Sequence, residues 1–193
     1  MKNKISVGIA ILLLITVFVR IFYVNNTSEK ALYEIIPMGE DAEIGENFFD
    51  DSNENMNGYV VTVKSSEIIS AEEYLNRFGK TLKDQHFEGL ENYYLVTVNV
   101  KNVDNQFVGE KGINFVRWYI QGSDYILKVE DVAYSLANES LNGSLQISLN
   151  QNKDMDFVLP FYMFSIDHPY EKIANDTSYL VISDYPTKLM LKI

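Results

Sequence analysis

The chain has 193 residues, of which 47% are hydrophobic and 13% aromatic, and it carries a formal net charge of −11. This composition is sufficient for one folded domain with a packed core and argues against wholesale disorder. The sequence contains no cysteine. That excludes a disulfide framework, a thiolate metal site, a cysteine nucleophile and a lipidated N-terminal cysteine.

The charge is distributed unevenly along the chain. Residues 1–24 contain three basic residues and no acidic one, so the rest of the chain carries 13 basic and 27 acidic residues, a formal charge of −14. A surface of that sign repels phosphate backbones and anionic lipid headgroups. We therefore expect no nucleic-acid partner and no peripheral binding to a bilayer.

Residues 5–24 (ISVGIAILLLITVFVRIFYV) form an apolar segment with one charge. Twenty residues in a helix span about 30 Å, the thickness of a hydrocarbon core. The basic flank at residues 1–4 then forms a cytoplasmic stub and places the C-terminal part outside the cell. The segment is thus predicted to be a single-pass transmembrane signal anchor. The alternative is a cleaved signal peptide and a secreted domain, but residues 22–31 contain no A-x-A-like cleavage site.

Residues 25–57 are predicted to be an acidic linker. Within it, residues 31–37 (ALYEIIP) have the pattern of an edge strand that ends at a proline, and Phe48 and Phe49 are expected to pack onto the domain. Residues 39–58 contain seven acidic residues and no basic one, which is typical of a solvated, self-repelling segment.

The predicted domain, residues 58–193, is organised around residues 93–102 (YYLVTVNVKN). Their apolar side chains recur with period two, which predicts a central strand with one face in a core. Residues 71–78 are predicted to form one short helix that Ser70 caps. Further strands are expected at 59–69, 113–121, 124–130, 144–149, 154–164, 178–183 and 187–193, with Pro160 interrupting the run 154–164.

Many short strands with turn signals between them predict an all-β fold, an antiparallel β-sandwich or barrel with one short helix, which follows an N-terminal transmembrane helix. Residues 94–102 (YLVTVNVKN), 156–160 (DFVLP) and 187–193 (TKLMLKI) resemble the strands of a family of uncharacterised extracellular domains. These domains of unknown function occur on membrane-anchored proteins of Gram-positive bacteria. The resemblance implies an immunoglobulin-like sandwich outside the membrane and implies no activity.

Catalytic chemistry finds little support in the sequence. The two histidines, His86 and His168, are too few for a convincing zinc site. Asp167 adjoins His168, but neighbours in an extended segment point apart, and no G-x-S-x-G pattern accompanies them. Calcium between sandwich loops is a further possibility, and an EF-hand loop is excluded by its missing glycine and glutamate. The calcium candidates are Asp154, Asp156, Asp167 and Asp184.

The aromatic residues suggest binding. Trp118 and Tyr119 are adjacent on one predicted strand, so Trp118 is expected in the core and Tyr119 on the outside. Exposed tyrosines then make a possible partner-binding patch, for which we select Tyr119, Tyr125 and Tyr170 from a wider set that includes Tyr134, Tyr162, Tyr179 and Tyr185.

The sequence therefore predicts a non-enzymatic, membrane-anchored extracellular binding module with no cofactor and no metal. Its expected partner is a protein or another component of the cell envelope. The alternatives are a hydrolase of cell-wall polymers, which would need two facing carboxylates, and an accessory subunit of a membrane complex.

Overall fold

The computed structural model describes residues 2–27, 32–50, 52–84, 90–107, 109, 111–164 and 166–193. The chain divides into two compact units, residues 1–31 and residues 32–193. The described part of the first unit is the helix α1 (Lys2–Thr27). Within the described part of the chain, no helix combines the length and the apolarity that crossing a membrane requires. The predicted transmembrane helix is therefore not supported.

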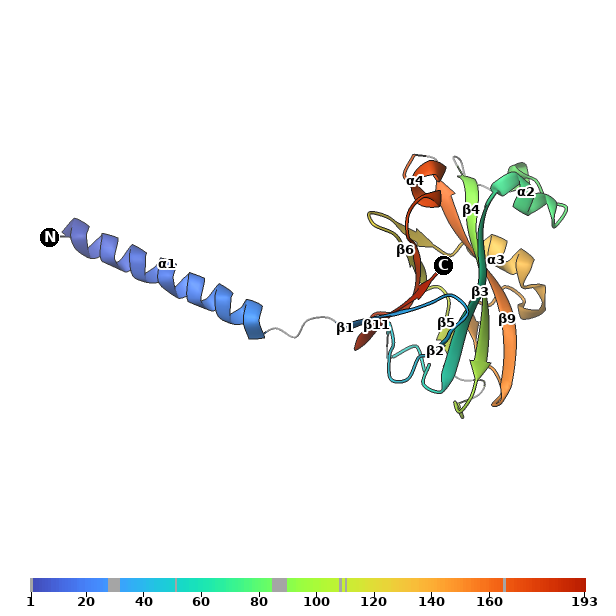
Figure 1. Cartoon of the computed structure of the whole chain (residues 1–193), viewed down its shortest axis with the longest axis horizontal. Coiled ribbons are helices and arrows are strands. Elements are labelled where there is room, and N and C mark those ends of the chain that lie inside the picture. The colour runs from blue at the N-terminus through green and yellow to red at the C-terminus, as the bar shows by residue number, and fades with distance from the viewer. Residues whose placement is uncertain are drawn as a thin grey trace. The chain divides into compact units, whose positions relative to one another are not determined.

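The second unit is a β-sandwich, which confirms the predicted all-β class (Figure 1). One sheet has the order β1 (Leu32–Ile36), β11 (Thr187–Lys192), β10 (Tyr179–Ser183), β6 (Tyr119–Gln121) and β7 (Ile126–Lys128). The other has the order β2 (Asp41–Glu43), β3 (Tyr59–Ser70), β4 (Leu90–Asn102) and β9 (Lys153–Phe164). A small third pair consists of β5 (Ile113–Asn114) and β8 (Gln146–Ile147).

Strand β4 is the central strand that the alternating pattern predicts. It pairs antiparallel with β3 on one side and with β9 on the other. Its inward side chains belong to the main core, because successive residues of a strand face opposite sides of the sheet. These are Tyr94, Val96, Val98 and Val100. Trp118, with no exposed surface, lies in the same core, as predicted.

Strand β9 runs unbroken through Pro160, contrary to the interruption that we expected. Because β9 is an edge strand of its sheet, the missing N–H of Pro160 removes no bond that the fold needs. The free side of β9 is occupied at this point. Its Pro160 carbonyl accepts a hydrogen bond from the backbone N–H of Glu130 at 2.8 Å.

The helices differ from prediction in number. Helix α2 (Ala71–Asn76) is confirmed, and the Ser70 hydroxyl accepts a bond from the Glu73 N–H as expected of its cap. The structure adds α3 (Asp131–Ala137), α4 (Tyr170–Ala174) and the 3₁₀ turns η1 (Leu82–Asp84) and η2 (Glu139–Leu141). One or two turns are too short to leave a clear period in the sequence, so the prediction of one helix is incomplete.

The folded unit begins at Leu32 and not at Gly58, which corrects the predicted linker. Strand β1 pairs in parallel with β11, and β2 pairs antiparallel with β3. Between β2 and β3, Phe48 exchanges backbone hydrogen bonds with Tyr185, which confirms that it packs onto the domain. Glu40, Asp41, Glu43 and Glu46 of this segment are exposed to water, and the buried Glu54 carboxylate accepts hydrogen bonds from the backbone N–H groups of Phe49 at 2.8 Å and Asp50 at 3.1 Å.

Candidate functional site: a hollow lined by asparagines

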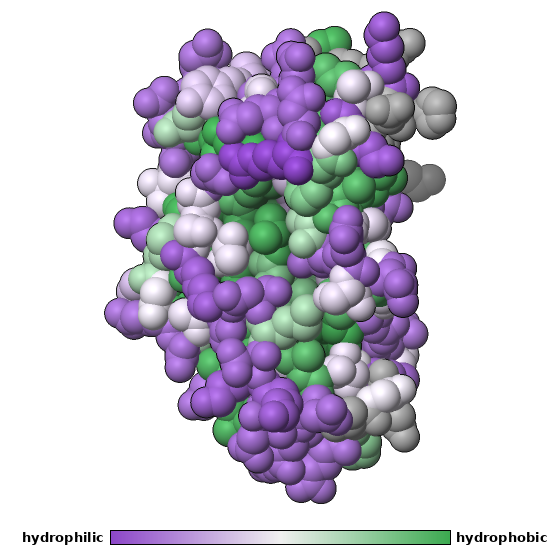
Figure 2. Space-filling view, turned by 90° about the vertical axis from the view of Figure 1, so that its right-hand side faces the viewer, coloured by the Kyte–Doolittle hydropathy of each residue, from purple (hydrophilic) through white to green (hydrophobic). Residues whose placement is uncertain are grey.

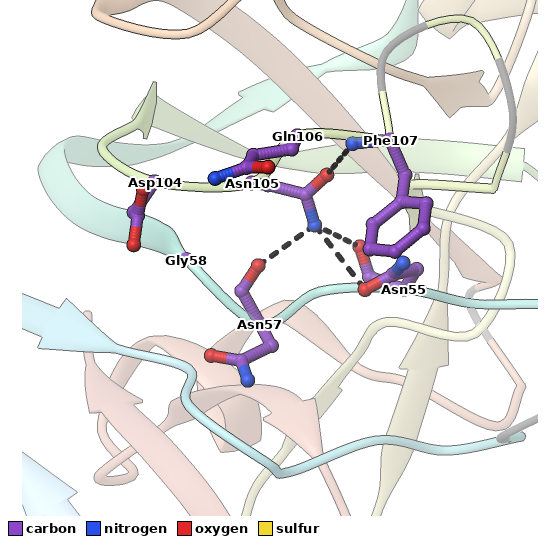
Figure 3. Close-up of a pocket in the computed structure, with 7 residues that line it drawn as sticks. All are labelled: Asn55, Asn57, Gly58, Asp104, Asn105, Gln106 and Phe107. Atoms are coloured by element: carbon purple, nitrogen blue, oxygen red, sulfur yellow. Dashed lines mark hydrogen bonds between the residues drawn. The ribbon is translucent and has the colours of Figure 1, made fainter.

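The hollow lies where two connections of the sandwich meet, the one between β2 and β3 and the one between β4 and β5. It has a volume of about 340 Å³, within the range of small-molecule sites. Seven residues line it, as Figure 3 shows: Asn55, Asn57, Gly58, Asp104, Asn105, Gln106 and Phe107.

Asn105 joins the two connections. Its side-chain amide is buried, and Nδ2 donates to the carbonyls of Asn55 at 2.9 Å and Asn57 at 2.7 Å (Figure 3). The same side chain accepts a bond from the backbone N–H of Phe107 at 3.0 Å. Because its donors and its acceptor are all used, Asn105 is a structural residue that fixes the shape of the hollow.

Asn102, at the end of β4, holds Asn105 in turn. Its fully buried side chain donates to the carbonyls of Asn105 at 2.9 Å and Leu149 at 2.7 Å and accepts from the N–H of Asn105 at 2.7 Å. Two buried amides in series thus connect three chain segments. A site supported in this way is preorganised, which reduces the entropy that a ligand would lose on binding.

Gly58 is required by the close approach of these segments. It has φ +86, a region that L side chains rarely adopt, and its carbonyl accepts the backbone N–H groups of Val103 and Asp104. A Cβ atom at this position would lie 2.5 Å from the backbone nitrogen of Asn105. The turn that the Asn57-Gly58 dipeptide signals in the sequence is therefore part of the wall of the hollow.

The groups left for a ligand include the Phe107 ring, the Gln106 amide and the Asp104 carboxylate. Phe107 is 55% exposed, although it is a large apolar side chain. Asp104 accepts one bond from Gln151 at 3.0 Å and retains acceptor capacity. Among the residues that line the hollow none is basic, so an anionic ligand would find no charge partner there.

A second hollow of about 180 Å³ adjoins the first and shares Asn57, Gly58 and Asp104 with it. Glu43 of β2 also lines it. Two acidic residues, Glu43 and Asp104, therefore line the same hollow.

The comparisons with known proteins concern the whole domain. Residues 33–189 match the model of the domain of unknown function DUF5028. The chain belongs to this family. The DUF5028 domain is similar to the crystal structure of an uncharacterised β-sandwich protein from Clostridium difficile 630, with 11% identity over 86% of this chain and 98% of the other and a TM-score of 0.43. A search of curated proteins returned no match.

The DUF5028 domain has a further hollow on the outer face of its four-stranded sheet. Helices α2 and α3 pack there over a second, smaller core, and the hollow of about 280 Å³ includes Tyr74, Phe78, Leu95 and Val158. Figure 2 shows this side of the molecule, with an apolar band bordered by hydrophilic residues. Arg77, which also lines this hollow, forms ion pairs with Glu67 and Glu73. The structure gives no indication of a ligand or partner that would cover the hollow.

The predicted tyrosines occupy different environments. Tyr119 and Tyr125 are each only 8% exposed, whereas Tyr170, the first residue of α4, is 48% exposed. The Tyr125 hydroxyl forms a 2.6 Å hydrogen bond with Ser178. Tyr119 faces outward from the sandwich, as predicted, but its ring is covered by Lys128 and Lys188. The three residues therefore do not form one exposed aromatic patch.

The wider set is equally dispersed, because the fold uses most tyrosines for packing. Tyr134 has no exposed surface and lies in the main core, and Tyr162 packs against the smaller core beneath α2. Tyr185 is exposed and makes an edge contact with Phe48.

The candidate metal ligands do not converge on one site, although Asp154 and Asp156 lie next to each other. Asp156 pairs with Lys64 at 2.6 Å, and this contact and Asn99 lower its pKa. Asp154 shares Asn99 with it, and Asp184 bonds Tyr119. Across the described ranges, no group of three or more histidine, aspartate or glutamate residues could hold a metal ion. His86 lies outside the described residues.

Sequence reasoning missed the asparagine-lined hollow. The sequence pattern ends the central strand at residue 102 and assigns residues 55–57 to the acidic linker, so neither turn is predicted to form a site. The available signal was the excess of asparagine and glutamine in both turns, since buried amides are the usual side chains for bonding loop backbone.

Proposed function

We propose that this protein is a non-enzymatic binding module whose ligand enters the asparagine-lined hollow. The observation that carries the proposal is the chemistry of the free groups there: one exposed aromatic ring, one free amide and one carboxylate on a rigid frame. Planar amides and carboxylates pair with neighbouring hydroxyl groups, and an aromatic ring packs against the C–H face of a sugar. The proposed ligand class is therefore an uncharged saccharide.

The experiment is a calorimetric titration of the full-length protein with oligomers of N-acetylglucosamine, a soluble probe with hydroxyl and amide groups. Phe107→Ala should weaken binding about tenfold, since an aromatic anchor is commonly worth 1–2 kcal/mol. Val116→Ala is the matched control, because Val116 is also 55% exposed but lies outside the hollow. Equal affinity of both variants would refute the assignment of the hollow.

A hydrolase of cell-wall polymers is the second candidate, favoured by the shared border of Glu43 and Asp104. Glycoside hydrolysis requires two such carboxylates, one acid and one base or nucleophile. Incubation of purified cell walls with the full-length protein should release no reducing sugar if the domain only binds. Release that Glu43→Gln and Asp104→Asn each abolish would establish the hydrolase instead.

We also propose an immunoglobulin-like arrangement and an extracellular location at the membrane. The immunoglobulin-like arrangement is supported by the parallel pairing of β1 with β11 and by the way in which the chain alternates between the two sheets. The location at the membrane is supported by the large apolar side chains of residues 11–24, which are exposed in the structure. Protease treatment of intact cells should digest residues 32–193, and carbonate washing should leave the protein in the membrane fraction. Release by carbonate would rule out an integral anchor.

A further inference from the structure

The outer face of the five-stranded sheet has an unusual charge for this protein. Residues 32–193 contain 12 basic and 26 acidic residues, yet the strands place three lysines on this one face. Strand alternation and register show why: Lys128 is paired with Tyr119, and Lys188 and Lys192 stand two residues to either side of the outward Met190. The fold thus collects on one surface positive charges that the sequence distributes over 65 residues.

Two of these lysines have no acidic partner. Among the described residues, neither Lys128 nor Lys192 lies within 4.0 Å of a carboxylate, and only Lys188 has one, Asp184 at 3.6 Å. Lys128 instead places Nζ 4.6 Å from the centre of the Tyr119 ring, and Lys188 places Nζ 5.3 Å from it. A cation–π contact orients an ammonium group without neutralising it.

Tyr119 contacts the charged groups on this face. Its hydroxyl donates to Asp184 at 2.8 Å and accepts from Lys188 at 3.0 Å, and Lys188 also donates to Gln121 at 2.6 Å. Burial and the bond to Asp184 raise the pKa of the phenol, which keeps Tyr119 neutral. The local charge is therefore positive.

Exposed apolar side chains flank the lysines. On β1, Tyr33 and Ile35 are 69% and 47% exposed, and on β7 Ile126 is 52% exposed. Tyr33 and Ile35 share the outward face because they are in register with Lys188 and Met190. We call the surface formed by Tyr33, Ile35, Ile126, Lys128, Lys188 and Lys192 the basic face. Helices α2 and α3 pack on the opposite sheet.

We infer that the basic face docks onto a lipid surface that carries anionic headgroups. Lysines attract such headgroups, while tyrosine and aliphatic side chains partition into the interface between headgroups and acyl chains. One face of the sheet presents both kinds of side chain. β1, which contributes Tyr33 and Ile35, is also the first strand after the apolar segment 5–24 in the sequence. Net charge alone predicted repulsion from a bilayer, and the clustering of lysines reverses that expectation for this face.

The test exploits the absence of cysteine. The full-length protein with Ile126→Cys carries a fluorophore on the basic face, and the protein with Val132→Cys, also exposed but on α3, carries it on the other side. Both are mixed with phosphatidylcholine vesicles, with or without phosphatidylglycerol, that contain a headgroup nitroxide quencher. The Ile126→Cys label should be quenched in anionic vesicles much more than the Val132→Cys label, and added salt should remove the difference.

Matched charge variants complete the test. The double variant Lys128→Gln with Lys192→Gln should bind the phosphatidylglycerol vesicles more weakly. The apparent affinity read from this quenching should fall about fivefold for each lysine removed. Lys101→Gln with Lys153→Gln removes the same charge from the other sheet and should leave it unchanged. Equal quenching at both labels, or no dependence on phosphatidylglycerol, would overturn the inference. So would a response of the Ile126→Cys label to soluble polyglutamate but not to vesicles, because the partner would then be an acidic polypeptide.

Discussion

Gly58 packs against the backbone of Asn105 so closely that a Cβ atom at position 58 would lie 2.5 Å from the backbone nitrogen of Asn105. This contact closes the wall of the asparagine-lined hollow and joins the start of β3 to the turn after β4. It also predicts how the two residues respond to substitution.

Gly58→Ala should destabilise the domain by about 3 kcal/mol or more, since it combines positive-φ strain with a backbone clash. Gly39→Ala is the matched control. Gly39 has φ +85, close to the +86 of Gly58, but a Cβ there meets nothing within 4 Å. It should cost only the strain, about 1–2 kcal/mol. Urea unfolding of both variants measures the difference, and equal losses would show that the clash is relieved without cost.

Asn105→Ala should destabilise the domain by about 2–4 kcal/mol. The substitution leaves the carbonyls of Asn55 and Asn57 and the N–H of Phe107 without their side-chain partner in a partly buried place. Gln106→Ala, at the next position, removes an amide without a bond in the described structure and should change stability by less than about 0.5 kcal/mol. Denaturant midpoints test both, and similar values for the two variants would contradict the structural role of Asn105.

Glu130 should make stability depend on pH. Its buried side chain caps α3 through the N–H of Val132 and, in a very short contact, that of Ala133. Burial raises its pKa in the folded state above the unfolded value of about 4.3. The protonated form therefore favours folding, and this contribution is complete below the unfolded pKa and lost as the pH rises through the folded pKa.

Glu130→Gln keeps an oxygen for the cap and removes the titration. The stability of the native protein relative to this variant should fall as the pH is raised from about 4 to about 7. Urea midpoints measured at intervals across that range would show it. A difference that stays constant with pH would mean that Glu130 titrates alike in the folded and unfolded chains.

Tyr119→Phe should cost more stability than Tyr125→Phe, although both side chains are 8% exposed. Tyr119 loses hydrogen bonds to two charged groups, Asp184 and Lys188, which predicts a loss of about 2 kcal/mol. Tyr125 loses one bond to the neutral Ser178 hydroxyl, worth about 1 kcal/mol. Thermal unfolding of the two variants tests the order, and the reverse order would show that Tyr119 contributes only packing.

The central strand was predictable. β4 has a clear period-two pattern because alternate side chains enter the main core, whereas the interruption expected at Pro160 was wrong because β9 is an edge strand that accommodates a proline. Helix α2 was predictable because Ser70 and Glu73 mark its start chemically. Helix α3 was not, because its cap is Glu130, a residue whose capping role depends on burial against the edge of β9.

The candidate site was less predictable from the sequence than the strands were. The acidic stretch before Gly58 has the composition of a free linker, and it folds because Phe48 and Ile44 find partners that lie far away in the chain. The tyrosines were selected for exposure, yet Tyr119 and Tyr125 are covered by residues from other parts of the chain, Lys128 and Ser178 among them. Composition describes how polar a segment is, whereas burial depends on which segments meet.

By itself the sequence determined the all-β class, the central strand, the core tryptophan and the lack of cysteine chemistry, because each depends on local periodicity or on counting. Only the tertiary structure decided that Asn102 and Asn105 build a hollow and that Lys128, Lys188 and Lys192 share one face. These groups are separated in the chain and become neighbours through strand register, which long-range pairing fixes. Net charge is a sum over the whole surface and carries no information about where the fold places each sign.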